Sequence, residues 1–228
     1  MPERVLAFYA HPDDADVSCG GTLAKWSAEG ASVEVVVCAA GDKGSSDAAV
    51  VPSQLAEQRA AEVERAARAL GLAGHHQLGH LDGDLVNDAA LRGEIVALVR
   101  SIRPDVVVCP DPTAVFFGSS YLNHRDHRVV GWATLDAVAH EARGPHYFPD
   151  AGPAHRVAEV WLSGALDPDT WVDIEKTIDA KTEALRCHES QVSEAGEWLR
   201  TFVQERAEEA GRQAGVRYAE GFRRLTLG

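Results

Sequence analysis

Short runs of consecutive apolar residues alternate along the chain with longer stretches in which apolar residues recur every three or four positions. An unbroken run of four to eight apolar residues is typical of a strand buried on both faces, and the wider spacing is typical of a helix packed on one face. The strands predicted in this way lie at residues 5–10, 32–39, 106–108, 157–163 and 171–174. The predicted helices lie at residues 23–29, 54–70, 88–102, 129–142, 175–187 and 194–210. This alternation predicts an α/β fold with a Rossmann-like, doubly wound, mostly parallel sheet flanked by helices.

Residues that restrict or free the backbone mark the ends of several segments. Pro12 cannot donate to a sheet and disfavours helix at the residue before it, so the first strand must end there. Ser53 can cap the first long helix, and Gly71 can end it. Because no repeat, low-complexity tract or linker interrupts the series, residues 1–228 are predicted to form a single domain.

The balance of charge argues against two classes of partner. The chain has 22 basic and 35 acidic residues, which give a net charge of −13. The electrostatic field of this negative charge repels nucleic acid and anionic membranes. No apolar stretch approaches the ~20 residues that a membrane span needs, and the N-terminal apolar run is too short for a signal peptide. The sequence therefore predicts neither a nucleic-acid partner nor a membrane partner.

The four cysteines are scattered and form no CxxC pair. Three of them lie among apolar or small residues, which is typical of buried thiols. Such a layout indicates reduced cysteines and not a disulfide framework, and so predicts a cytoplasmic protein. These residues are Cys19, Cys38, Cys109 and Cys187.

The first predicted strand ends in a polar cluster, His11-Pro12-Asp13-Asp14. Open α/β sheets bind their ligands at the carboxyl ends of strands. An aspartate here could simply cap the following helix, but a cap does not account for His11. The glycines that follow, Gly20-Gly21-Thr22, lack the GxGxxG spacing of a dinucleotide loop. The cluster therefore indicates a catalytic or metal site.

A second pair of histidines, His124 and His127, stands three residues apart at the start of a predicted helix. Imidazole and carboxylate suit Zn²⁺ or Fe²⁺, and a catalytic zinc needs three protein ligands with one position open for water. His11, Asp14 and one histidine of this pair supply that set. Zinc lowers the pKa of its bound water to about 7. Asp13 would then be free to act as general base, and the remaining histidine as a proton donor.

A further group of histidines is an alternative source of metal ligands. It comprises His75, His76 and His80, and it is predicted to lie in a loop. These residues have no carboxylate partner in a strand-end turn, so we assign them no role.

Two motifs occur together in this chain: AHPDDAD followed by GGT, and the HxxDH-type sequence His124-Arg125-Asp126-His127. Shorter matches lie between and after them: Arg59-Ala-Ala-Glu62, Leu70-Gly71, Asp82-Gly83, Lys181, His188-Glu-Ser-Gln191 and Ala219-Glu220-Gly-Phe222. Over nearly its whole length the chain thus resembles the PIG-L/LmbE family of zinc-dependent de-N-acetylases.

The resemblance implies a metal centre. Its ligands would be His11, Asp14 and His127, and Asp13 would be the general base. The implied cofactor is Zn²⁺, with Fe²⁺ or another divalent metal as the alternative.

The resemblance also implies roles for four other residues. His124 would stabilise developing charge or act as general acid, and Asp126 would tune it by hydrogen bonding. Because a neighbouring carboxylate favours imidazolium, the pKa of His124 is expected to be raised. Arg59 and Asp82 match positions that contact the sugar in relatives.

The chain departs from the family pattern at two positions. Arg125 replaces the usual proline, and Tyr121 lies three residues before His124 instead of two. The second departure leaves open whether Tyr121 contacts the oxyanion that forms when the amide is hydrolysed. Since relatives form trimers and hexamers, the resemblance also implies a homo-oligomer.

The predicted activity is zinc-dependent hydrolysis of an N-acyl amide, with acetate released from an N-acetylglucosamine-type sugar or glycoconjugate. One alternative is an amidase of thiol conjugates such as mycothiol S-conjugates. Another is a non-catalytic sugar-binding α/β module, which would leave Asp13 beside the metal site unexplained.

Overall fold

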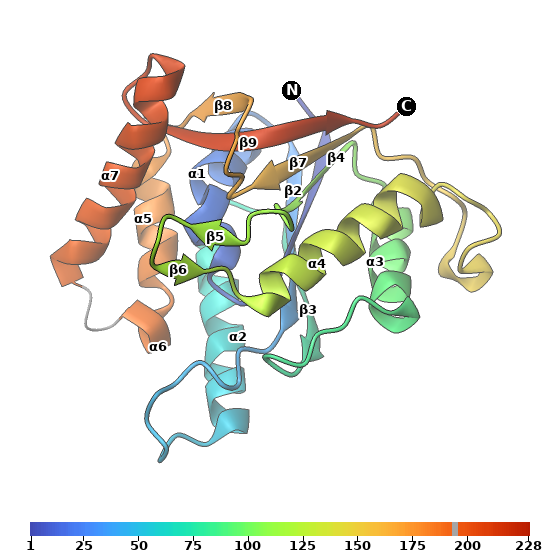
Figure 1. Ribbon diagram of the computed structural model, residues 1–228, viewed down its shortest axis with the longest axis horizontal. Coiled ribbons are helices and arrows are strands. Elements are labelled where there is room, and N and C mark those ends of the chain that lie inside the picture. The colour runs from blue at the N-terminus through green and yellow to red at the C-terminus, as the bar shows by residue number, and fades with distance from the viewer. Residues whose placement is uncertain (193–195) are drawn as a thin grey trace.

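The computed structural model describes residues 1–192 and 196–228, and its centre is a seven-stranded sheet (Figure 1). The spatial order of the strands is β3-β2-β1-β4-β7-β9-β8. The first five strands in this order run parallel, whereas β9 is antiparallel to both of its neighbours. Their bounds are β1 Arg4–Tyr9, β2 Ser32–Ala39, β3 Gly74–His80, β4 Val106–Pro110, β7 Glu159–Ser163, β8 Thr170–Asp173 and β9 Ala219–Thr226.

Helices cover both faces of this sheet. Their bounds are α1 Asp14–Ala28, α2 Pro52–Ala69, α3 Ala89–Ile102, α4 Arg125–Asp136, α5 Ile178–Arg186, α6 Glu189–Val192 and α7 Gly196–Ala214. A π-helical segment, Ala137–Glu141, extends α4. A short hairpin, β5 Phe116–Phe117 and β6 Tyr121–Leu122, lies between α7 and α4 in the view of Figure 1. In the described part of the chain, none of the helices has the length and apolar character required to cross a bilayer.

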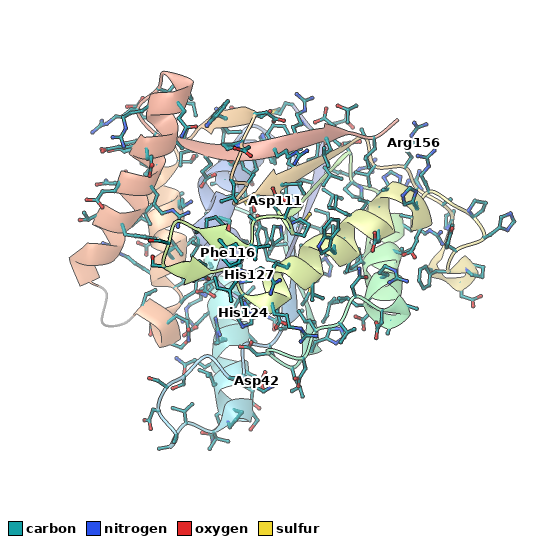
Figure 2. The ribbon with its side chains drawn as sticks, viewed as in Figure 1. Asp42, Asp111, Phe116, His124, His127 and Arg156 are labelled. Carbon is teal, nitrogen blue, oxygen red and sulfur yellow. The ribbon has the colours of Figure 1, made fainter. Side chains whose placement is uncertain are left out.

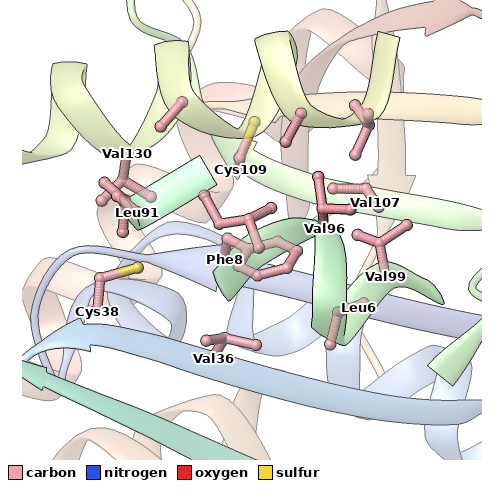
Figure 3. Close-up of a cluster of buried hydrophobic side chains, with 14 of the residues drawn as sticks. Leu6, Phe8, Val36, Cys38, Leu91, Val96, Val99, Val107, Cys109 and Val130 are labelled. Carbon is pink, nitrogen blue, oxygen red and sulfur yellow. The ribbon is translucent and has the colours of Figure 1, made fainter. Parts of the chain in front are cut away.

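Alternate residues of β1 face the two halves of the core. Leu6 and Phe8 pack beneath α3 and α4, where Val99 and Val130 meet them (Figure 3). Val5, Ala7 and Tyr9 belong to the other half, which is covered by α1, α5 and α7. Since β1 is buried on both faces, its apolar run has no polar interruption before His11.

The predicted fold class is confirmed, and it locates the functional edge of the sheet. The chain order reverses between β1 and β4, which lie side by side at the centre. In open α/β sheets the crevice at such a switch point, beyond the carboxyl ends of the strands, is the usual place for a ligand. His11 follows β1 at this point.

Some predicted boundaries and assignments were wrong. The segment with His75, His76 and His80 is not a loop but strand β3. The pattern hid this strand because its seven residues include three histidines, two glycines and only one large apolar residue, Leu78. The C-terminal strand β9 and the β5–β6 hairpin were also missed. Helix α2 begins at Pro52, so Ser53 is not its cap. The last helix is described from Gly196 onward, and the predicted start at residue 194 lies outside the described residues.

Helix α1 begins at Asp14, nine residues before the predicted start. A kink at Cys19, where φ is −148°, divides it in two. The amides of Gly21 and Thr22, freed by this kink, donate to the Glu220 carboxylate at 3.1 and 2.7 Å. Lys181 Nζ donates to the same carboxylate at 2.5 Å. Glu220 of β9 thus caps the second half of α1.

Arg100 in α3 organises the segment after α4. Its side chain is buried, with 3% of the residue exposed. The guanidinium group donates to backbone carbonyls that belong to Glu141, Ala142, Gly144, Tyr147, Phe148 and Gly152. One side chain therefore satisfies acceptors that would otherwise be buried without donors.

We expect Arg100→Met to lower the free energy of unfolding by about 3–5 kcal/mol, because the carbonyl groups would lose their charged donor. Urea denaturation followed by circular dichroism measures this loss. Arg68→Met is the matched control, because Arg68 is exposed on α2 and its removal should change stability by less than about 0.5 kcal/mol. Equal stabilities of the two variants would contradict the role given to Arg100.

Candidate metal centre and active site

Two segments far apart in sequence meet at the carboxyl edge of the sheet. The turn after β1 carries His11, Asp13 and Asp14. The loop after β4 leads to the start of α4, where His124 is the N-cap residue and His127 lies in the first turn (Figure 2). The structure therefore brings together the two motifs that the sequence separates by more than one hundred residues.

Three predicted ligands converge on one point. His11 Nδ1 lies 3.1 Å from His127 Nε2, and His127 Nε2 lies 3.1 Å from Asp14 Oδ1. Asp14 Oδ2 lies 3.4 Å from His11 Nδ1. Burial opposes ionisation of Asp14, but the positive charge of His127 and bonds from both histidines lower its pKa well below the usual range. Two nitrogens and a carboxylate are thus directed at a common centre.

This arrangement fits a divalent metal. Tetrahedral zinc sites with bonds of about 2.0–2.2 Å place their ligand atoms roughly 3.3–3.6 Å apart, close to the spacings observed here. The donors are imidazole and carboxylate, which zinc and Fe²⁺ both accept. Two groups of possible ligands around His11 also occur among the described residues: His11, His124 and His127, and His11, Asp82, His124 and Asp126. On these grounds the residues present can hold a metal ion.

Asn123 fixes the orientation of His127. Its Oδ1 atom lies 2.9 Å from His127 Nδ1, and its Nδ2 atom donates to the Ala114 carbonyl at 2.8 Å. Because the side-chain amide of Asn123 is anchored in this way, its Oδ1 atom accepts the proton on His127 Nδ1. The Nε2 atom of His127 is then left free to bind a metal. The sequence interpretation missed Asn123; its position one turn before His127 was the available signal.

We expect Asn123→Ala to weaken metal binding about 10–100-fold, since partners that orient metal ligands typically contribute this much. Titration of the metal-free protein with Zn²⁺ in competition with a chelating dye measures the change. Thr113→Ala is the control, because Thr113 bonds to Asp111 and not to a predicted ligand. If Asn123→Ala keeps the affinity of the parent, the amide does not set the orientation of His127.

Two carboxylates surround the other nitrogen of His11. Nε2 is buried and lies 3.2 Å from Asp82 Oδ1 and 3.5 Å from Asp126 Oδ2. Burial lowers the pKa of His11, but the carboxylates of Asp126, Asp14 and Asp82 outweigh it and raise the pKa to about 12. The cluster therefore favours a positive charge at its centre, as a metal-binding site should.

These contacts differ from the hydrogen bond expected between Asp126 and His124. The carboxylate of Asp126 faces His11 and accepts the Gly83 amide at 2.7 Å. Only its backbone amide reaches His124, where Nδ1 accepts it at 3.3 Å. The expectation of a raised pKa for His124 was also wrong: burial lowers this pKa, and the charge of His11 acts in the same direction.

Arg59 and Asp13 form an ion pair at the edge of the cluster. Arg59 Nη2 donates to Asp13 Oδ1 at 2.9 Å, and Nη1 donates to the Gly41 carbonyl at 3.1 Å. Arg59 has 3% of its side chain exposed, and Asp13 has 26%. Asp13 is thus held next to the predicted ligands but does not share their common centre. Gly41 has a φ of +67° and leaves no room for a side chain beneath the guanidinium group.

The motifs of the C-terminal region support the turn that carries Asp13 and Asp14. His188 is fully buried, and its Nε2 atom lies 2.6 Å from Asp16 Oδ2. Ser190 donates to the buried carboxylate of Glu62 in α2 through both its amide and its hydroxyl. These bonds tie α1 and α2 to the segment after α5.

Other candidates lie away from the centre. Tyr121 is exposed on β6, packed against Phe117 at a ring distance of 6.0 Å. On and beside β3, His76 pairs with Glu34 and His80 pairs with Glu94, and neither histidine joins the ligand group. The structure supplies no role for these two histidines, whereas Tyr121 lines the same cavity as Asp14 and His127.

The sequence model of the PIG-L family, described as GlcNAc-PI de-N-acetylase, matches residues 6–138, more than half of the chain. The chain belongs to the PIG-L family. The predicted family is therefore confirmed, and the matched region contains the candidate ligands from both segments.

Similarity to named relatives extends over the rest of the chain. Diacetylchitobiose deacetylase of Thermococcus kodakarensis is 33% identical over 97% of this chain and 82% of its own length. 1D-myo-inositol 2-acetamido-2-deoxy-alpha-D-glucopyranoside deacetylase of Rhodococcus jostii is 30% identical over 84% of this chain and 82% of its own. The solved structure of N,N'-diacetylchitobiose deacetylase from Pyrococcus horikoshii superposes with a TM-score of 0.89 at 30% identity, covering 99% of this chain and 84% of that one.

Proposed function

We propose that this member of the PIG-L family is a metal-dependent de-N-acetylase that releases acetate from an N-acetylglucosamine-type sugar or glycoconjugate. Its relatives named above are deacetylases of such compounds. The observation that carries the proposal is the convergence of His11 Nδ1, Asp14 and His127 Nε2 beside an aspartate that is not part of their cluster. A sugar-binding module would have no need of that arrangement.

The proposed metal ligands are His11, Asp14 and His127, and the proposed metal is zinc, with Fe²⁺ as the alternative. A divalent metal held by these residues would polarise an amide carbonyl and would lower the pKa of a bound water. Asp13 is the proposed general base, which removes a proton from the attacking water. Its bond to Arg59 occupies one carboxylate oxygen and fixes the side chain, so the other oxygen can accept the proton.

His124 is the proposed general acid. Because its Nδ1 atom accepts the Asp126 amide, the neutral ring carries its proton on Nε2. That proton can stabilise the oxyanion formed on the acyl carbon by hydrogen bonding. To act as the acid, the ring must first take up a second proton; the imidazolium then gives one proton to the leaving nitrogen when the C–N bond breaks and returns to the neutral form. The overall reaction consumes one water and yields acetate and a free amine.

Arg59 was predicted to contact the sugar, but its bond to Asp13 supports a role in positioning the base. We expect Arg59→Met to lower kcat about tenfold or more while changing KM little, because Asp13 would lose its orientation. Steady-state kinetics on N-acetylglucosamine separates the two roles. A rise in KM at unchanged kcat would instead assign Arg59 to sugar binding.

Acetate release from a panel of N-acetylated sugars and mycothiol S-conjugates tests the proposal, with bound metal assayed alongside. We expect acetate from the sugars and no cleavage of the thiol conjugates. Cleavage of the conjugates alone would establish the amidase alternative, and tight sugar binding without turnover would establish the binding module. Size measurement in solution tests the further proposal of a homo-oligomer.

A further inference from the structure

The chain after β3 turns sharply at the carboxyl edge of the sheet. The Asp84 amide donates to the Leu81 carbonyl at 3.2 Å, which closes a β-turn over residues 81–84. Gly83 is the third residue of this turn and has a φ of +80°, as type II turns require. Because β3 is an edge strand, the turn lies at the margin of the sheet (Figure 1). Leu81, Gly83 and Asp84 are all exposed, so little apolar packing holds the turn in place.

Side chains from the loop after β2 hold the Asp82 end of the turn. The Asp82 amide donates to Asp42 Oδ1 at 2.9 Å, and the Asp82 carbonyl accepts a bond from Lys43 Nζ at 2.5 Å. Lys43 Nζ also lies 3.2 Å from Asp84 Oδ2. Both backbone groups of Asp82 are therefore fixed by side chains of another strand-end loop.

Side chains from the start of α4 hold the Gly83 end. The Gly83 amide donates to Asp126 Oδ2 at 2.7 Å, and the Gly83 carbonyl accepts a bond from Arg125 Nη1 at 2.7 Å. Arg125 occupies the position at which this chain departs from the proline of the family pattern. A proline has no side-chain group to donate, so this bond distinguishes the chain from that pattern. The turn is thus held from two sides, by the loop after β2 and by α4.

The turn carries the carboxylate of Asp82 to His11. Asp82 Oδ1 lies 3.2 Å from His11 Nε2, and the other ring nitrogen of His11, Nδ1, is the proposed metal-binding atom. A carboxylate beside the second nitrogen of a metal-binding histidine fixes the orientation of the ring and strengthens metal binding. The position of this carboxylate depends on a turn that has little packing of its own.

We infer that Lys43 and Arg125 are positioning residues, which hold the turn at Asp82 and Gly83 so that the Asp82 carboxylate orients His11 for metal binding. The inference rests on the metal ligands of the proposed function. It adds two exposed cations to the residues that determine metal affinity. In the described part of the chain, their side chains bond to the turn and not to a proposed ligand.

The charge of these two residues makes the inference testable by the sign of an effect. Positive charge repels a metal ion, so the simple loss of a cation near the site would tighten metal binding. Loss of positioning would weaken metal binding, because the carboxylate behind His11 would move. Asp126 gives no such contrast, since its own carboxylate lies 3.5 Å from His11 Nε2.

Titration of the metal-free protein with Zn²⁺, in competition with a chelating dye and without sugar, measures the effect. We expect Arg125→Met and Lys43→Met each to weaken Zn²⁺ binding about three- to tenfold, less than or equal to the roughly 10–100-fold typical of a direct partner of a ligand. Arg125→Lys keeps a charged donor and should recover most of the lost affinity. Arg68→Met removes an exposed arginine of α2 and is the matched control, which should keep the parental affinity.

The Asp82→Ala variant shows whether the effect passes through the carboxylate. This change alone should weaken Zn²⁺ binding about tenfold. In the Asp82→Ala background, Arg125→Met should cause no further weakening, because the turn then has no carboxylate to position. If Arg125→Met weakens binding by the same factor in both backgrounds, Arg125 acts on the site by another route and the inference is overturned.

The titration also separates this inference from the proposed function. Unchanged or tighter Zn²⁺ binding in both Arg125→Met and Lys43→Met would overturn the inference and leave the proposed function standing. The expected weakening in a protein that releases no acetate from any N-acetylated sugar would support the inference and refute the proposed function. A parent that binds no Zn²⁺ would overturn both.

Discussion

Asp13→Asn is expected to retain the metal and to lower kcat roughly 10²–10⁴-fold, the usual contribution of a general base. The asparagine can still accept a hydrogen bond from Arg59 and occupies the same volume, so the fold should persist. The amide cannot take a proton from water, however. Because the side chain does not share the centre formed by His11, Asp14 and His127, metal content should remain that of the parent.

The Asp14→Asn variant distinguishes the proposed metal ligand from the proposed general base. The carboxylate of Asp14 contacts His11 and His127, so its replacement should remove the metal together with the activity. Asp47→Asn changes an exposed loop carboxylate and serves as the control that should alter neither. Metal analysis and kcat are measured on all three variants. Loss of metal in Asp13→Asn, with metal retained in Asp14→Asn, would reverse the two roles.

Removal of the metal ligands is expected to have the second large effect. The parent should contain about one divalent ion per chain, as three-ligand catalytic sites do. His11→Ala and His127→Ala should each lose most of this ion and essentially all activity, because two ligands rarely hold a catalytic metal. Chelation of the parent should abolish activity, and addition of Zn²⁺ or Fe²⁺ should restore it.

Elemental analysis of the purified variants measures the metal directly. His75→Ala is the matched control, because this histidine lies on β3 and belongs to no ligand group in the described residues. It should keep both metal and activity. Parental metal content in both His11→Ala and His127→Ala would exclude both histidines as ligands and place the ion elsewhere. Loss of metal in His11→Ala alone would instead point to the group formed by His11, Asp82, His124 and Asp126.

Strands buried on both faces were the elements that the sequence predicted best. β1, β2 and β4 consist largely of apolar residues, since each packs against helices on both sides. β3 was missed because its solvent contact permits three histidines and two glycines, and its pairing with β2 is held by backbone bonds that any side chain allows. The start of α1 was missed because its kink is capped by Glu220, some two hundred residues away.

The HPDD and HxxDH motifs by themselves indicated the family and the class of chemistry, because those properties depend on which donor groups are present. They left open which histidine of the second pair joins His11 and Asp14, and the resemblance to the family implied His127. Only the tertiary structure decided which of these side chains contact one another. The parallel pairing of β1 with β4 brings the motifs together, and packing turns the carboxylates of Asp82 and Asp126 toward His11 and Arg59 toward Asp13. The orientation of a side chain depends on every neighbour it meets, and those neighbours come from all parts of the chain.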